Sequence, residues 1–173
     1  GTGKFYSNGL DLEWLVAHPD RSDSYVHRVQ RLFGRLLTFP MPTLAAVNGH
    51  AFGAGAMAAL AHDYRIMRDD RGYFCFPEVE IDIPFTPGMA ALIQAKLLPQ
   101  TALTAMTTGH RYTADTAVRV GLVDSASGLE TLTDTAVDHL RPLVGKTPAT
   151  VAAIKHTMFD TVSAALNRGR SQP

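Results

Sequence analysis

The stretch NGHAFGAGAMAALAHD, Asn48–Asp63, decides how the chain is read, because almost no side chain stands on its central FGAGA segment. The preceding apolar run predicts a buried strand over Thr43–Asn48, and Gly49 begins a turn. The run of small apolar residues after the turn predicts a buried helix over Gly55–His62. Such a bare turn permits either close packing of a helix on a sheet or contact between a ligand and the backbone. The stretch alone leaves both interpretations open.

A strand, a glycine-rich turn and a helix in succession direct unpaired backbone N–H groups toward one point, where the helix dipole adds partial positive charge. This arrangement suits a phosphate or a developing oxyanion. The turn lacks the full GxGxxG pattern and the GK[ST] of a P-loop, so neither nucleotide motif is present. The segment SNGLDL, Ser7–Leu12, is a second turn of this kind, with Asp11 as the predicted N-cap of a helix. One N–H group from each turn would make a two-donor oxyanion hole for the enolate of a thioester.

The rest of the chain alternates between strand and helix patterns, which predicts an α/β fold with parallel-type crossovers. A strand is predicted over Tyr64–Arg68, another over Tyr73–Phe76 and a short one over Leu122–Val123. A short helix is predicted within Gly9–Pro19, after the N-cap Asp11. The other predicted helices are Ser22–Phe39, Gly88–Leu97, Pro99–Thr107, Thr113–Val120, Leu129–Val144 and Pro148–Leu166, with an irregular loop over Glu78–Pro87.

Composition excludes several classes of protein. The 173 residues are 46% hydrophobic and 18% charged, as in a packed globular chain. Sixteen basic residues balance sixteen acidic ones, so no net field favours nucleic acid or an anionic membrane. The single cysteine, Cys75, excludes an internal disulfide and favours a reducing compartment over secretion. The expected location is the bacterial cytoplasm, with a peroxisome or a mitochondrion as the alternatives. No apolar run reaches the length of a membrane span, and no signal peptide is evident. The opening residues, GTGKFYSNG, read as the middle of a domain whose earlier strands are missing.

The candidate acid–base group lies in FCFPEVEIDIPFTPG, Phe74–Gly88, where three acids alternate with apolar residues. A carboxylate among apolar neighbours has a raised pKa, which suits proton transfer near neutral pH. Glu78 is preferred, because Pro77 fixes its backbone and aromatic residues precede it. A strand edge with solvated acids is the alternative, and whether Glu80 or Asp82 assists stays open.

Other chemistry finds little support. No GxSxG elbow is present, and the histidines have no metal-ligand spacing such as HExxH, so no metal site is expected. Cys75 is interpreted as a small core residue, and Asp63 as a turn residue.

Four segments in order resemble the enoyl-CoA hydratase/isomerase family, also called the crotonase superfamily. They are GKFYSNGLDL (Gly3–Leu12), PTLAAVNGHAFGAGAMAALAHDYRIM (Pro42–Met67), FPEVEIDIPFTPG (Phe76–Gly88) and TGHRYTADTAVRVGLVD (Thr108–Asp124). The segment DRGYFCFPEVEIDIPF, Asp70–Phe85, looks most like the Δ3,Δ2-enoyl-CoA isomerase branch, especially its plant peroxisomal members.

The resemblance implies a single crotonase-like domain over 1–173, with a ββα spiral core over 1–125 and a helical region over 126–173. It implies trimers or hexamers, acyl-CoA thioester ligands and no bound cofactor, since coenzyme A is part of the substrate. The thioester oxygen would be held by the N–H groups of Leu10 and Ala54, where the family usually has a small residue and a glycine. Gly9 and Gly53 would contact the substrate beside them.

The resemblance also places the acids. Family hydratases use two glutamates, but the first position is Met57 here and only the second, Glu78, is acidic. A single carboxylate implies a proton shift rather than addition of water, so the expected reaction converts 3-enoyl-CoA to 2-trans-enoyl-CoA in fatty-acid β-oxidation. The expected acyl-pocket walls, each of which also suits ordinary core packing, are Met57, Phe76, Phe85 and Met89. The alternatives are hydration, thioester hydrolysis, decarboxylation and non-catalytic binding of acyl-CoA.

Overall fold

The computed structural model describes residues 1–168, and its fold is α/β, as the alternating pattern predicts. Within these residues, six short strands form two three-stranded sheets, both parallel, ordered β1-β3-β5 and β2-β4-β6. The strands are β1 (Phe5–Ser7), β2 (Leu44–Val47), β3 (His50–Phe52), β4 (Tyr64–Arg68), β5 (Phe74–Cys75) and β6 (Ser125–Ser127). Successive strands therefore alternate between the two sheets, which is the spiral arrangement that the family resemblance implies.

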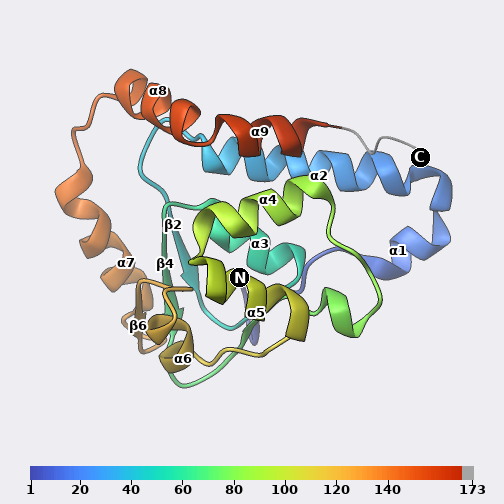
Figure 1. Cartoon of the computed structure of the whole chain (residues 1–173). Helices are drawn as coiled ribbons and strands as arrows, with labels where there is room; N and C mark the ends of the chain where they lie inside the picture. Colours follow the sequence, from blue (N-terminus) through green and yellow to red (C-terminus); the bar gives the residue numbers. More distant parts are fainter. Residues whose placement is uncertain (169–173) are drawn as a thin grey trace.

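The α-helices cover the strands and continue after them (Figure 1). They are α1 (Leu12–Ala17), α2 (Ser22–Leu37), α3 (Ala54–Ala61), α4 (Pro87–Lys96), α5 (Pro99–Thr108), α6 (Ala114–Arg119), α7 (Leu132–Leu140), α8 (Pro148–Met158) and α9 (Asp160–Asn167). Three short 3₁₀ turns also occur in the described residues, namely η1 (Pro19–Arg21), η2 (Glu78–Glu80) and η3 (Arg141–Leu143). Helix α9 packs on α2 and α4, so the C-terminal part of the chain lies against the first long helix.

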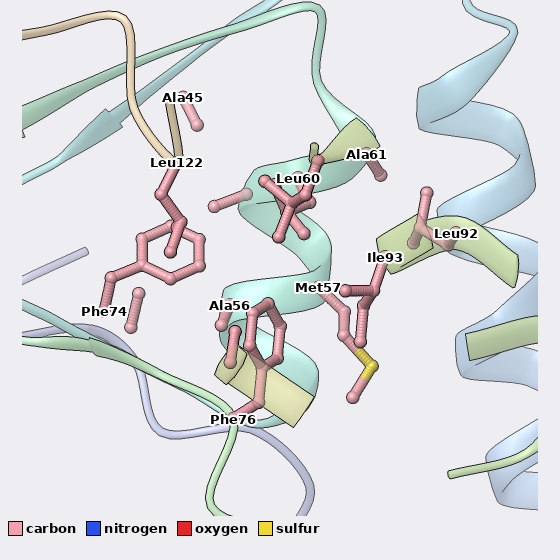
Figure 2. Close-up of a cluster of buried hydrophobic side chains, with 14 of the residues drawn as sticks. Ala45, Ala56, Met57, Leu60, Ala61, Phe74, Phe76, Leu92, Ile93 and Leu122 are labelled. Carbon is pink, nitrogen blue, oxygen red and sulfur yellow. The ribbon is translucent and has the colours of Figure 1, made fainter. Parts of the chain in front are cut away.

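Helix α3 is the centre of the core. Its residues are buried almost without exception, and most of them are alanine or glycine. Figure 2 shows Ala56, Met57 and Leu60 surrounded by side chains from other elements, among them Phe74 and Ile93. Small residues let a helix approach its neighbours closely, so this segment packs tightly as well as bordering the site described below.

Two local predictions, one of a turn and one of a strand, are wrong, and strand β1 was not predicted. The segment after Gly49, predicted as a turn, contains β3, whose Ala51 donates to the Tyr73 carbonyl at 2.9 Å while His50 donates to the Lys4 carbonyl at 2.9 Å. A strand of three residues is too short to show a period, and its bonding partners lie far away in sequence. The predicted strand Leu122–Val123 is instead a buried turn after α6, and the strand that pairs with β4 is the more polar β6.

The closing helices are interrupted where single long helices were predicted. The segment predicted as Leu129–Val144 forms α7 and then the short turn η3, which contains Pro142. The segment predicted as Pro148–Leu166 divides into α8 and α9 at Phe159, whose buried ring anchors the bend in the core. The last five residues of the predicted helical region, 169–173, lie outside the described residues.

Candidate active site

A cavity of about 210 Å³ lies where the turn after β1, the turn after β3, the loop after β5 and the start of α4 meet. It brings together every predicted site residue except Phe76. The lining residues are Asn8, Gly9, Leu10, Leu12, Phe52, Gly53, Ala54, Met57, Pro77, Glu78, Ile81, Ile83, Pro84, Phe85 and Met89. The two side-chain-poor turns, distant in sequence, thus form one site.

The two turns touch through glycine. Gly9 has a φ of 91°, which favours glycine, and a Cβ there would lie 2.9 Å from the Phe52 carbonyl oxygen and 3.2 Å from the Ala54 nitrogen. Any side chain at this position would push the turns apart. The absence of a side chain therefore sets the distance between the backbone of the first turn and that of the second.

The second turn brings a carboxylate against bare backbone. Gly53 is the N-cap of α3 with a φ of 51°, and a Cβ there would lie 3.3 Å from Glu78 Oε1. Besides letting the helix pack closely, the FGAGA segment thus brings bare backbone next to the Glu78 carboxyl. The backbone of the turn is exposed to the same cavity as the Glu78 carboxyl.

Both predicted oxyanion donors are unpaired in the described part of the chain. Ala54 is the first residue of α3, so no preceding turn of helix offers its N–H a carbonyl. The N–H of Leu10 also donates to nothing in residues 1–168, although Gly9 donates to Ser7 Oγ at 3.3 Å and Asp11 to the Tyr25 hydroxyl at 3.3 Å. Both free N–H groups belong to residues that line the cavity.

Glu78 begins the 3₁₀ turn η2 and is 9% exposed. Its Oε2 has no hydrogen-bond partner among the described residues, and burial raises the pKa of Glu78 to about 7. A carboxyl that titrates near neutral pH can both accept and return a proton there. Because the segment is a turn rather than a strand, the neighbouring acids need not alternate with it: Glu80 and Asp82 are exposed and do not line the cavity.

Apolar side chains form the remaining walls. Met57, Phe85 and Met89 line the cavity as expected, whereas Phe76 does not. The Phe76 ring is fully buried behind the wall and packs edge-on against Phe85, with centroids 6.5 Å apart. Figure 2 shows it beside α3 within the core. The prediction that Phe76 is a wall of the pocket is therefore corrected: its ring supports Phe85 from behind.

Several lining residues were missed by the sequence analysis, namely Asn8, Leu12, Phe52, Pro77, Ile81, Ile83 and Pro84. Each adjoins a residue that was singled out, so proximity in the chain was the only available signal. In the part of the chain that the structure describes, no three His, Cys, Asp or Glu side chains are grouped so that they could hold a metal ion. Nor is any described helix both long and apolar enough to cross a membrane.

The sequence model of a family described as enoyl-CoA hydratase/isomerase matches residues 1–172, and the chain belongs to that family. The peroxisomal enoyl-CoA delta isomerase 1 of Arabidopsis thaliana is 40% identical over 127 residues, which are 73% of this chain and 53% of the relative. The carnitinyl-CoA dehydratase of Salmonella arizonae is 38% identical over 168 residues, 96% of this chain and 63% of the relative. The chain thus spans about half the length of the curated isomerases it matches.

Solved structures show the same fold. Human mitochondrial delta3-delta2-enoyl-CoA isomerase superposes with a TM-score of 0.89 at 24% identity, over 95% of this chain and 65% of that one. A probable enoyl-CoA hydratase from Mycobacterium tuberculosis superposes with a TM-score of 0.90 at 23% identity, over 98% and 72%. The crotonase-like fold is therefore established for this chain.

Proposed function

We propose that the chain isomerises 3-enoyl-CoA to 2-trans-enoyl-CoA, a reaction of fatty-acid β-oxidation. One observation carries the proposal: Glu78 is the only ionisable side chain among the described residues that line the cavity. Addition of water by two acids would need a second carboxyl, and the family position for it is Met57, an apolar side chain on the wall. A single carboxyl suffices for a proton shift.

In the proposed mechanism, the carboxylate of Glu78 removes a proton from C2 of the substrate. The electrons move onto the thioester oxygen, and the N–H groups of Leu10 and Ala54 stabilise that negative charge. Glu78 then returns the proton at C4, and the double bond forms between C2 and C3. No atom enters or leaves, so the step needs neither water nor a cofactor beyond the coenzyme A that the substrate carries.

Two further observations support this assignment. The pKa of Glu78, about 7, allows the same group to act as base and as acid near neutral pH. The curated relatives at 40% identity are named enoyl-CoA delta isomerases, a name that agrees with a proton shift.

The test mixes the purified protein with a medium-chain 3-enoyl-CoA and follows absorbance as the double bond becomes conjugated with the thioester. Wild type is expected to conjugate it, and the Glu78→Gln variant to bind acyl-CoA without turnover. Absence of conjugation by wild type, with the acyl-CoA still bound, would remove the isomerase assignment. A variant as active as wild type would exclude Glu78 as the base.

A dehydratase or hydratase is the second candidate, favoured by the 38% identity to carnitinyl-CoA dehydratase over nearly the whole chain. The Met57→Glu variant separates the two candidates, because a two-acid hydratase should be inactive without this second carboxyl. An isomerase does not need this second carboxyl, so wild type is expected to leave 2-enoyl-CoA unhydrated. Hydration by wild type would favour this candidate, release of free CoA thiol would indicate thioester hydrolysis, and loss of carbon dioxide from a carboxyacyl-CoA would indicate decarboxylation.

We also propose a homotrimer or hexamer in the bacterial cytoplasm. The family resemblance supports the assembly, and the single buried Cys75 supports a reducing compartment, although a peroxisomal isomerase is among the relatives. Light scattering on the purified protein measures the assembly directly, and a monomer would contradict it.

A further inference from the structure

A second cavity, of about 140 Å³, lies beside the first. The two share four lining residues, Leu10, Ile83, Pro84 and Met89, so these side chains border both cavities. All four are apolar, and the unbranched Met89 changes shape readily. An acyl chain held at Leu10 and Ala54 can therefore extend from the first cavity toward the second.

A buried glutamine on α2 faces the second cavity. Gln30 is 4% exposed, and its Oε1 accepts a hydrogen bond from Thr86 Oγ1 at 2.8 Å. The Thr86 hydroxyl also accepts from the Met89 N–H at 3.2 Å, so its single proton is committed to Gln30. The amide oxygen therefore points to Thr86, and the Nε2 group points the other way. In residues 1–168 this NH₂ donates no hydrogen bond, although the nitrogen is not one of the fully buried polar atoms that lack a partner.

A histidine on the same face of α2 is also unpaired. His27 precedes Gln30 by one helical turn, so both side chains project to the same side. The His27 Nδ1 atom is buried and has no hydrogen-bond partner among the described residues. Both residues line the second cavity. Buried polar atoms are paired in the great majority of proteins, which indicates that an occupant with its own polar atom belongs here.

We propose that the acyl chain of the substrate carries a hydroxyl group, which His27 and Gln30 bind in this second cavity. The inference rests on the proposed function, because it takes an acyl-CoA ester as the ligand. A hydroxyl accepts one hydrogen bond from Gln30 Nε2. It forms a second with His27 Nδ1, as donor or acceptor according to the tautomer of the ring. The protein thus distinguishes a hydroxyacyl chain from a plain alkyl chain, which would leave both groups unpaired.

The cavity does not suit a negatively charged chain end, because the carboxylate residue Asp23 already lines it. Neither lysine nor arginine lines it in the described part of the chain, so a carboxylate would lose its hydration without a counter-charge. A neutral hydroxyl has no such requirement. The ligand class is therefore a hydroxyacyl-CoA rather than a dicarboxylic acyl-CoA.

The test measures binding rather than turnover, with pairs of saturated acyl-CoA esters from butanoyl to decanoyl. The two members of each pair differ only in ending with a methyl or a hydroxyl group. At the chain length that reaches the cavity, the hydroxyl ester is expected to bind wild type about tenfold tighter than its methyl partner, as two net hydrogen bonds provide. Equal binding throughout the series, as water filling the cavity would give, overturns the proposal.

Two variants locate the preference. Gln30→Leu keeps the volume and removes the amide, and His27→Phe removes the ring nitrogens without touching the Thr86 contact, in case the first variant does not fold. Each is expected to reduce the preference to about threefold or less. A preference that survives in both overturns the site. Conjugation of 3-enoyl-CoA with equal binding of both esters rejects only this inference, whereas failure of every ester to bind rejects the proposed function as well.

Discussion

Two carboxylates of this chain, Glu78 and Asp63, lie in the folded interior with opposite surroundings. Glu78 faces a cavity, and its Oε2 has no partner in the described residues. Asp63 Oδ2 accepts from the Thr43 N–H at 2.7 Å, from the Thr43 hydroxyl at 3.2 Å and from Lys155 Nζ at 2.5 Å. The first group is held in an environment that disfavours its charge, and the second in one that stabilises it.

The difference separates a group placed for proton transfer from one placed for stability. Burial without a partner costs free energy, and a protein retains such a carboxyl where its proton is used. Burial with three donors joins distant segments: Lys155 of α8 reaches the start of β2 through Asp63 and also donates to the Met41 carbonyl at 2.9 Å. Removing the Glu78 carboxyl should therefore lower turnover without lowering stability, whereas removing the cation that pairs with Asp63 should lower stability without lowering turnover.

The largest expected effect is on turnover by Glu78→Gln. Loss of the proposed base should lower kcat by about a thousandfold or more. The free energy of unfolding at neutral pH should not fall, because a neutral amide replaces a poorly solvated carboxyl. Conjugation kinetics and urea unfolding measure the two quantities.

Glu80→Gln is the matched control, since Glu80 is exposed, does not line the cavity, and forms an ion pair only with the exposed Arg111, at 3.8 Å, among the described residues. It should retain wild-type kcat. A comparable loss of activity in both variants would mean that the segment as a whole, rather than the Glu78 carboxyl, is required.

The next effect is on stability. Lys155→Met leaves the Asp63 carboxylate, 17% exposed, without its cation, so the free energy of unfolding should fall by about 3 kcal/mol. The kcat of the folded protein should stay near wild type, because neither residue lines the cavity.

An exposed ion pair provides the control for this loss. Asp138 and Arg141 lie 3.0 Å apart with most of each side chain exposed, so Asp138→Asn should cost less than about 0.5 kcal/mol. If Lys155→Met were equally mild, the buried pair would contribute no more than a surface pair, and the contrast with Glu78 would fail.

The pH dependence is a third way to separate the two carboxyls. Burial raises the pKa of Glu78 from 4.5 to about 7, so between these values the folded protein holds a proton that the unfolded chain has lost. The contribution of Glu78 to stability is therefore full below pH 4.5 and is lost as pH rises toward 7, with a slope of at most about 1.4 kcal/mol per pH unit.

Over the same interval kcat/KM should rise, because the ionised carboxyl is the base. Unfolding curves of wild type and Glu78→Gln across this range measure the stability term as a difference. A difference that does not change with pH, or a rate that is flat through neutrality, would place the pKa of Glu78 outside this range.

The sequence predicted the elements that carry their own signal. The strand Tyr64–Arg68 matches β4 at both ends, and the amphipathic pattern after Ser22 predicted α2 to within two residues of its end. The strands β1, β3 and β6 were missed because their existence depends on partners that are distant in sequence rather than on a local period.

The site was predicted unevenly for the same reason. The glycine turns and Glu78 stand out locally, and they meet at one cavity. Asp63 was interpreted as a turn residue, because its cation lies 92 residues away and no local pattern connects them. Phe76 was misplaced since the direction of a side chain in an irregular loop has no period from which it can be inferred. The catalytic and binding roles stay predictions.

A third carboxylate, Asp11, gives the smallest expected effect and refines the comparison. It is exposed, and its Oδ1 caps α1 by accepting from the Trp14 N–H at 2.9 Å, beside the proposed oxyanion donor Leu10. Asp11→Ala should lower the free energy of unfolding by about 1 kcal/mol or less, and Asp11→Ser, which keeps a capping oxygen, should restore most of it. Because the cap fixes the direction of the Leu10 backbone, kcat/KM for 3-enoyl-CoA should fall several-fold in the alanine variant and recover in the serine variant. If the serine variant were as impaired as the alanine variant, the charge of Asp11 rather than its capping oxygen would be required. Asp11 would then be a residue placed for the reaction, like Glu78, rather than one placed for stability, like Asp63.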